Sequence, residues 1–220
     1  SVTSIGAYAF SDCSSLASIE IPNSVATIGT GVFQNCSSLA SIEIPNSVTS
    51  IGGYAFSGCS SLASIEIPNS VATIGDYAFN GCTALTDLRF EDGEGTLSLG
   101  YKSSSQGLFY DCPLETLYIG RTLSYDTSGS CGYSPFYNKT TLKNVAFGDN
   151  FTTVGSYLFY NCSALTSVEL PGGVTSIGHY AFAGCSKLAS VSIGGGVESI
   201  GSNAFTGCTA LKDLRFEDGE

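Results

Sequence analysis

The feature that most constrains this chain is a repeat of 23 residues. The string CSSLASIEIPNSV stands unchanged at residues 13–25, 36–48 and 59–71. Alignment on the phenylalanine three residues before each cysteine brings nine units into register, at Phe10, Phe33, Phe56, Phe79, Phe109, Phe136, Phe159, Phe182 and Phe205. A short fixed period is typical of a solenoid, in which each unit is one turn that packs on its neighbours.

The pattern within one unit predicts the secondary structure. A unit reads LxxIxIPxxVxxIGxxAFxxCxx, and its LxxIxI segment alternates apolar and polar positions, as a half-buried strand does. Pro22 lacks an N–H group and ends the first such strand, while Gly29 allows a left-handed turn or close packing. The chain is therefore predicted to be a leucine-rich repeat solenoid of nine stacked repeats. We expect a parallel β-sheet on the concave face, short strands or 3-10 turns on the convex side, and little α-helix.

The signature IPxxVxxIGxxAFxxC resembles the BspA-like leucine-rich repeats of bacterial and protozoan surface proteins. Its proline is kept only at Pro22, Pro45, Pro68 and Pro171, so the later units follow the pattern more loosely. The resemblance implies a cell-surface or secreted protein that adheres to host proteins, extracellular matrix or other cells. Fibronectin and fibrinogen are ligands that the resemblance suggests.

The composition limits the possible binding partners and bears on the domain organisation. A formal net charge of −11 disfavours nucleic acid and anionic membranes, which need clustered Lys and Arg. No apolar run approaches the ~18 residues of a membrane span, and no signal peptide is recognisable. We expect one domain over 1–220, with regular repeats at 1–93 and 150–220 and irregular repeats at 94–149. The chain has no methionine and begins inside a repeat, so we read it as a fragment of a longer protein.

Eight of the nine cysteines recur at one position of the repeat, at Cys13, Cys36, Cys59, Cys82, Cys112, Cys162, Cys185 and Cys208. Side chains at equivalent positions of a stack point the same way, which is poor geometry for a disulfide, so buried thiols are predicted. Zinc is disfavoured because no CxxC is present and the one histidine, His179, falls in a variable turn. Cys131 is predicted to replace a core isoleucine. Lys139 takes a ladder cysteine position, where we expect the stack to be broken or opened.

The irregular middle is one candidate binding region. Extra residues around 101–107 and 121–129 follow the strands, and insertions in repeat proteins map to loops on one face. The candidate residues here are Tyr101, Tyr118, Tyr125, Tyr133, Arg89 and Arg121, because Tyr and Arg are enriched at interfaces. The alternative is that irregular repeats need larger residues to fill space.

The outward strand positions are the second candidate. The middle position of IxI holds Glu20, Glu43 and Glu66, then Arg89 and Tyr118. These three carboxylates repel one another mildly, and the acidic stripe suits a basic partner or a cation. Repeat duplication explains the stripe equally well.

No activated nucleophile, phosphate-binding loop or dinucleotide motif is present, and identical repeats give carboxylates identical surroundings, so neither an enzyme nor a cofactor is predicted. Two functions remain. The first is an extracellular adhesion module that binds a protein or glycan ligand, such as a matrix or host surface protein. The second is a rigid spacer with no ligand of its own. Residues 82–94 and 208–220 are nearly identical, which suggests a longer repeat of 126 residues, and uncapped ends would allow end-to-end self-association.

Overall fold

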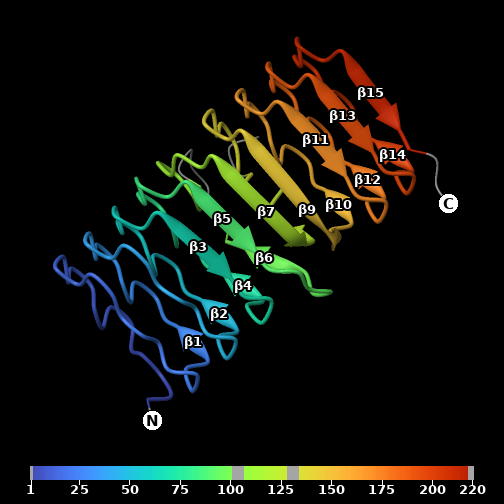
Figure 1. The fold of residues 1–220 in the computed structure, drawn as a ribbon. Coiled ribbons are helices and arrows are strands. Elements are labelled where there is room, and N and C mark those ends of the chain that lie inside the picture. The colour runs from blue at the N-terminus through green and yellow to red at the C-terminus, as the bar shows by residue number, and fades with distance from the viewer. Residues whose placement is uncertain (1, 101–106, 128–133, 218–220) are drawn as a thin grey trace.

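The structure, a computed structural model, describes residues 2–100, 107–127 and 134–217. Figure 1 shows the turns stacked in a row, with the two termini at opposite ends of the stack. Throughout these residues the chain forms strands and turns, with no helix of any kind. The predicted solenoid of parallel strands is confirmed, with short strands and single turns closed by bonds between residues three apart, such as Cys36 N to Phe33 O at 3.1 Å.

From the third turn on, each turn supplies one longer and one shorter strand, and the earlier described turns supply a shorter strand or a single bridge. Within each block of the sheet, both kinds pair in parallel with the equivalent strand of the next turn. The longer strands are β3 (Ser64–Ile67), β5 (Asp87–Phe90), β7 (Thr116–Arg121), β9 (Asn144–Asn150), β11 (Ser167–Leu170), β13 (Ser190–Ile193) and β15 (Asp213–Phe216). The shorter strands are β1 (Thr27–Ile28), β2 (Ser50–Ile51), β4 (Thr73–Ile74), β6 (Leu97–Leu99), β8 (Leu123–Ser124), β10 (Thr153–Val154), β12 (Ser176–Ile177) and β14 (Ser199–Ile200). We call the surface of the longer strands the long-strand face.

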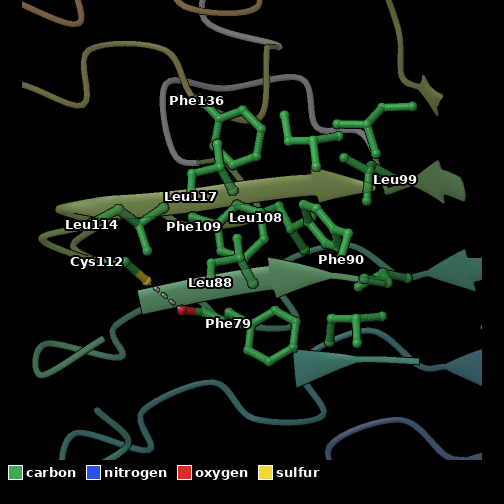
Figure 2. Packing of buried hydrophobic residues seen from close by; sticks show 14 of the residues in the cluster. Phe79, Leu88, Phe90, Leu99, Leu108, Phe109, Cys112, Leu114, Leu117 and Phe136 are labelled. Carbon is green, nitrogen blue, oxygen red and sulfur yellow. Dashed lines mark hydrogen bonds between the residues drawn. The ribbon is translucent and has the colours of Figure 1, made fainter. Parts of the chain in front are cut away.

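A column of phenylalanine rings runs through the core. The nine repeat phenylalanines stack on one another with ring centroids 5.3–6.0 Å apart. Figure 2 shows Phe79, Phe109 and Phe136 of this column among inward leucines such as Leu88 and Leu117. Because every turn contributes the same ring at the same place, the core is continuous along the array.

The ladder cysteines have a role that the sequence pattern did not reveal. From Cys36 onward, the thiol of each described ladder cysteine donates to the carbonyl oxygen of the phenylalanine in the preceding turn, at 3.0–3.3 Å. Figure 2 draws the bond from Cys112 to Phe79. The eight ladder cysteines are free thiols, and six of them are buried, as predicted. Cys13 is exposed on the first turn.

Two backbone positions explain the recurrent small and polar residues. The residue before each ladder cysteine, and before Lys139, has a left-handed φ between 57° and 78°, and it is always Asn, Asp or Gly. These residue types tolerate that conformation best. The glycine of Ile-Gly serves close packing instead, because a Cβ on Gly52 would lie 2.6 Å from the backbone of the preceding turn.

Lys139 does not break the stack where it replaces the cysteine. Its ammonium donates to the carbonyl oxygen of Phe109, the bond that the thiol makes in other turns, and to that of Cys112 at 3.1 Å. The Phe109 and Phe136 rings stack on either side of this step, 5.6 Å apart. The prediction that Lys139 opens the array at its own position is therefore wrong, because a long flexible side chain places its charge on two backbone acceptors.

One turn after Lys139, strand pairing is interrupted in the sheet of longer strands and in the sheet of shorter strands. In the part of the chain that the structure describes, neither β9 and β11 nor β8 and β10 are paired, although every other neighbouring pair of strands is. The turns on either side are joined instead by the phenylalanine column, by Thr122 and Thr152, whose hydroxyls lie 2.7 Å apart, and by the bond from Asn138 N to Tyr160 O. We call this junction the seam.

Candidate functional site

Two rows of outward side chains run across β3, β5, β7 and β9 on the long-strand face. Strand pairing aligns Ser64, Asp87, Thr116 and Asn144 in one row, and Glu66, Arg89, Tyr118 and Ala146 in the other. These are the outward positions that the strand pattern predicts. The second row changes character along the stack, from a carboxylate to a guanidinium, an aromatic ring and a methyl group.

Arg89 and Tyr118 lie at the centre of a polar cluster. The Arg89 side chain pairs with Glu66 at 2.9 Å and with Asp92 at 3.5 Å, while its guanidinium carbon lies 3.9 Å from the centre of the Tyr118 ring. The Tyr118 hydroxyl donates to Asp92 at 2.7 Å, and this bond to a carboxylate raises the pKa of Tyr118 above its ordinary value. Both side chains are held in one geometry by several partners, as a contact site requires.

The other row carries a second hydrogen-bonded carboxylate. Thr116 and Thr86 both donate to Asp87, the latter at 2.7 Å, and these two bonds lower the pKa of the Asp87 carboxyl. Asp87 is therefore charged at neutral pH and retains capacity to accept further hydrogen bonds. Beside it, Lys143 and Glu115 form an exposed ion pair at 2.6 Å.

An open groove of about 420 Å³ runs between the two rows and is lined by residues from all four strands. Ala146 is exposed at one end of it, since its methyl group leaves the space beside Tyr118 unfilled. We call this depression the Tyr118 groove. It offers one aromatic ring, one guanidinium and several hydroxyl, amide and carboxylate groups, which suits recognition of a ligand more than chemical conversion.

A second open groove, of about 810 Å³, adjoins the first at Glu66 and extends toward the first turns. Glu43, Glu66 and Glu91 all line it. Glu20 and Glu43 are exposed, as predicted, but the equivalent segments of their turns form no strand ladder. Among the residues the structure describes, no three His, Cys, Asp or Glu side chains come close enough to hold a metal ion.

Arg121 is not a surface ligand group. It ends β7 and is buried, with its guanidinium donating to the carbonyl oxygens of Asn69 at 2.8 Å and Pro68 at 2.9 Å, two turns back. Burial lowers its pKa. Gly93 lies beside this side chain, and a Cβ there would lie 3.1 Å from the Cβ of Asn69. Arg121 was predicted to lie in a loop insertion. Its side chain instead bonds to the backbone two turns back and so joins three turns.

Tyr125 is half-buried and packs against the core. It follows Ser124, which pairs with Ser98, so Tyr125 stands level with Leu99 at the isoleucine position of its turn. Its hydroxyl donates to Ser156 O at 2.9 Å, and desolvation by burial raises its pKa. Cys131, which was predicted to fill this position, lies outside the described residues.

Two other candidates, Tyr101 and Tyr133, also lie outside the described residues. His179 is exposed, as predicted, and its Nδ1 accepts a bond from Ser202 N at 3.0 Å. The sequence reasoning missed Asp92, which holds both Arg89 and Tyr118. Its signal was the pair of extra residues between Phe90 and Leu99, which lengthen the segment that follows β5.

A stack of 23-residue turns with parallel strands and an aligned outward row defines the chain as a leucine-rich repeat solenoid with a surface suited to recognition. The sequence profile described as "BspA type Leucine rich repeat region (6 copies)" matches residues 3–128 and 102–219. The chain belongs to this BspA type family, as its signature predicted.

Several solved structures are similar to the chain. A leucine rich cell surface protein from Faecalibacterium prausnitzii is 25% identical, with 100% of this chain and 70% of that chain covered and a TM-score of 0.47. A leucine-rich repeat protein from Bacteroides ovatus is 24% identical, with 100% and 82% covered and a TM-score of 0.46. The leucine rich repeat protein of T. pallidum is 26% identical, with 96% and 72% covered and a TM-score of 0.41. Among curated proteins, none matches this chain.

Proposed function

We propose that the chain is a non-enzymatic recognition module of a cell-surface or secreted bacterial protein, and that it binds a protein or glycan ligand at the Tyr118 groove. Host surface and matrix proteins such as fibronectin and fibrinogen are the first candidates. Membership of the BspA type family supports the surface location. No described helix is long and apolar enough to cross a membrane.

One observation carries the proposal. The outward row is glutamate in the first three turns, becomes Arg89 in the last regular turn before the irregular repeats, and then Tyr118 and Ala146 within them. The changed residues form a linked cluster beside a groove, rather than a random set of exposed side chains. Aromatic and arginine side chains held rigidly next to a depression are typical of binding hot spots.

A rigid spacer is the second candidate, and the identity of the first turns favours it. Ser18, Ser41 and Ser64, like Glu20, Glu43 and Glu66, are the same in each copy, whereas recognition usually diversifies exposed positions. A spacer requires only the continuous core and ladder, which these turns supply.

Equilibrium binding to immobilised fibronectin, fibrinogen and a panel of host glycans, at two salt concentrations, separates the two. We expect saturable binding that Tyr118→Ala weakens about thirtyfold, since truncation of a hot-spot side chain costs about 2 kcal/mol. Arg89→Ala should weaken it as well.

Arg215→Ala is the matched control. Arg215 occupies the same position in a strand of identical sequence, DLRF, but it pairs with Asp213 and has no tyrosine beside it. Binding should survive in this variant. Equal loss in Arg89→Ala and Arg215→Ala would indicate a general charge effect and contradict the site. If the chain binds none of the immobilised proteins and glycans, the rigid spacer is the better explanation of its function.

A further inference from the structure

A pocket of about 390 Å³ opens on the edge of the solenoid that carries the cysteine turns, between the fifth and sixth repeats. We call it the Lys139 notch. Its polar and aromatic lining includes Tyr110, Asp111, Tyr137, Asn138, Thr140 and Thr141. It shares no residue with the Tyr118 groove.

Three departures from the repeat rule meet in this notch. Cys112 and Leu114 are two residues apart, whereas the equivalent residues Cys82 and Leu85 are three apart, so the fifth turn is one residue short here. Lys139 replaces a ladder cysteine in the sixth turn. The position after the repeat phenylalanine also becomes tyrosine in these two turns. Because these three departures coincide in space, sequence divergence within a single repeat does not explain them.

The lysine gives the notch a fixed donor. Within the described chain, the Lys139 ammonium donates to the carbonyl oxygens of Phe109 and Cys112. An ammonium carries three N–H groups, so these two bonds leave one for a ligand acceptor. Lys139 is half-buried, and desolvation lowers its pKa.

The tyrosines give the notch its apolar surfaces. The Tyr110 side chain is 37% exposed at one wall. At the other wall, Tyr137 stacks on Tyr160 with ring centroids 5.8 Å apart, and Tyr160 in turn lies 6.0 Å from Tyr157 and 6.4 Å from Tyr180. A run of aromatic rings therefore leads from the notch along the edge of the next two turns.

We propose that the Lys139 notch is a carbohydrate subsite that takes one pyranose ring of a glycan, with the rest of the glycan lying along Tyr160, Tyr157 and Tyr180. A pyranose presents apolar C–H faces, which pack on aromatic rings, and hydroxyl groups around its edge. The exposed Asp111 and Asn138 supply acceptors and donors for those hydroxyls. A pocket of this volume fits a small ring, whereas a protein partner needs about 800 Å² of surface on each side.

Saturation-transfer NMR and calorimetry on the whole chain test the site. The probes are the methyl glycosides of glucose, galactose, mannose, N-acetylglucosamine and N-acetylgalactosamine, with the β-1,4-linked dimers of glucose and of N-acetylglucosamine. We expect saturable millimolar binding of at least one probe and tighter binding of its dimer.

The chain offers variants that carry residues from its own other turns. Tyr110→Ser and Tyr137→Ser introduce the residue found at Ser11 and Ser57, and Lys139→Cys restores the ladder cysteine. Each should weaken binding at least tenfold while circular dichroism shows intact strands. Tyr137→Phe keeps the ring and should bind within a few fold of the wild type.

Tyr54→Ala is the control and should bind normally. Tyr54 stacks on Tyr77 in earlier turns, away from the notch. The proposal is overturned if no probe gives saturable binding, if binding survives both serine variants, or if Tyr54→Ala abolishes it equally. The Tyr118 groove can fail its own test without affecting this one, because the two sites share no side chain.

Discussion

In turn after turn, a cysteine thiol lies against the phenylalanine column and donates to a carbonyl of the turn before it. Burial in the stack disfavours the thiolate and raises the pKa of Cys59 to about 12, of Cys162 to about 12 and of Cys208 to about 11. Each thiol thus donates a second bond to a carbonyl oxygen that already accepts a backbone N–H bond, as Phe33 O accepts from both Cys36 N and Cys59 Sγ.

These thiols make stability depend on pH. A thiol in the unfolded chain has a pKa of about 8.5, so its folded value is raised and the stabilisation is complete below that pH. As pH rises toward 11–12, the unfolded chain gains thiolates that the folded chain cannot hold. We expect the free energy of unfolding in urea to fall above about pH 9, by about 1.4 kcal/mol per pH unit for each such thiol.

Cys59→Ala should make the free energy of unfolding fall less steeply above about pH 9, by the contribution of one thiol. The variant also loses the Cys59 bond to Phe33, so its stability at pH 7 should be lower while its pH dependence is shallower. An unchanged slope in the variant would show that Cys59 ionises equally well in both states.

Arg121 is the residue with the most unusual surroundings. Arg121→Ala removes the donors to the carbonyls of Pro68 and Asn69, and the free energy of unfolding should fall by about 2–4 kcal/mol. Arg121→Lys should recover only part of this, because an ammonium cannot reproduce the planar fork of a guanidinium.

Arg215→Ala again serves as the comparison for Arg121. Its side chain is 73% exposed, so its loss should change stability by less than about 0.5 kcal/mol. A similar cost for both variants in urea titrations would mean that the buried bonds of Arg121 contribute nothing.

At the scale of strands, the seam divides the ladders into two blocks. The edge of β11 that faces β9 makes no ladder bond in the described chain, whereas β13 is paired on both sides. Unpaired amides exchange readily with solvent. In hydrogen–deuterium exchange, Ser167–Leu170 should therefore exchange faster than Ser190–Ile193. Equal protection of the two strands would contradict an open ladder at the seam.

The strands themselves were predictable, because identical units must pack identically and the period-2 pattern of LxxIxI sets which side chains face inward. The register of Glu66, Arg89 and Tyr118 follows directly from alignment of the repeats. Pairings that skip a turn were not predictable. Nothing in the local pattern of Arg121 indicates that its acceptors lie 52 and 53 residues earlier.

The left-handed backbone at the tyrosine turns was also not predictable from the sequence. Two residues before the repeat phenylalanine, the chain is left-handed in seven turns, and this position is tyrosine in five of them, at Tyr8, Tyr54, Tyr77, Tyr157 and Tyr180. Bulky residues seldom adopt positive φ, so pattern reasoning assigns no such conformation to them. Ring stacking between neighbouring turns, as in Tyr157 and Tyr180 at 5.2 Å, compensates for the strain.

For the whole molecule, the seam predicts two cooperative units. Repeat arrays derive their stability from interfaces between neighbours, and a weak interface lets the blocks on either side unfold separately. We expect urea unfolding, followed by tyrosine fluorescence, to show two steps, with residues 151–217 lost independently of the earlier turns. Thr152→Val removes one member of the hydroxyl pair across the seam and should separate the steps further.

Thr175→Val is the control for that experiment. Thr175 bonds to Thr152 O within the second block and does not cross the seam. Its loss should lower the midpoint of the second step and should leave the first step unchanged. A single sharp transition in the wild type and in Thr152→Val would show that the core and the remaining bonds across the seam couple the whole array.

The direction of the ladder hydrogen bonds has a mechanical consequence. The bonds between turns run along the stack, and the two termini lie at opposite ends of it (Figure 1). A pull on the ends therefore loads the bonds along their own axis, one interface after another, rather than shearing many at once. The array yields by unzipping, first at the seam and then turn by turn. Under tension the solenoid therefore lengthens in small steps. Each step dissipates part of a sudden load before the load passes from one end of the solenoid to the other.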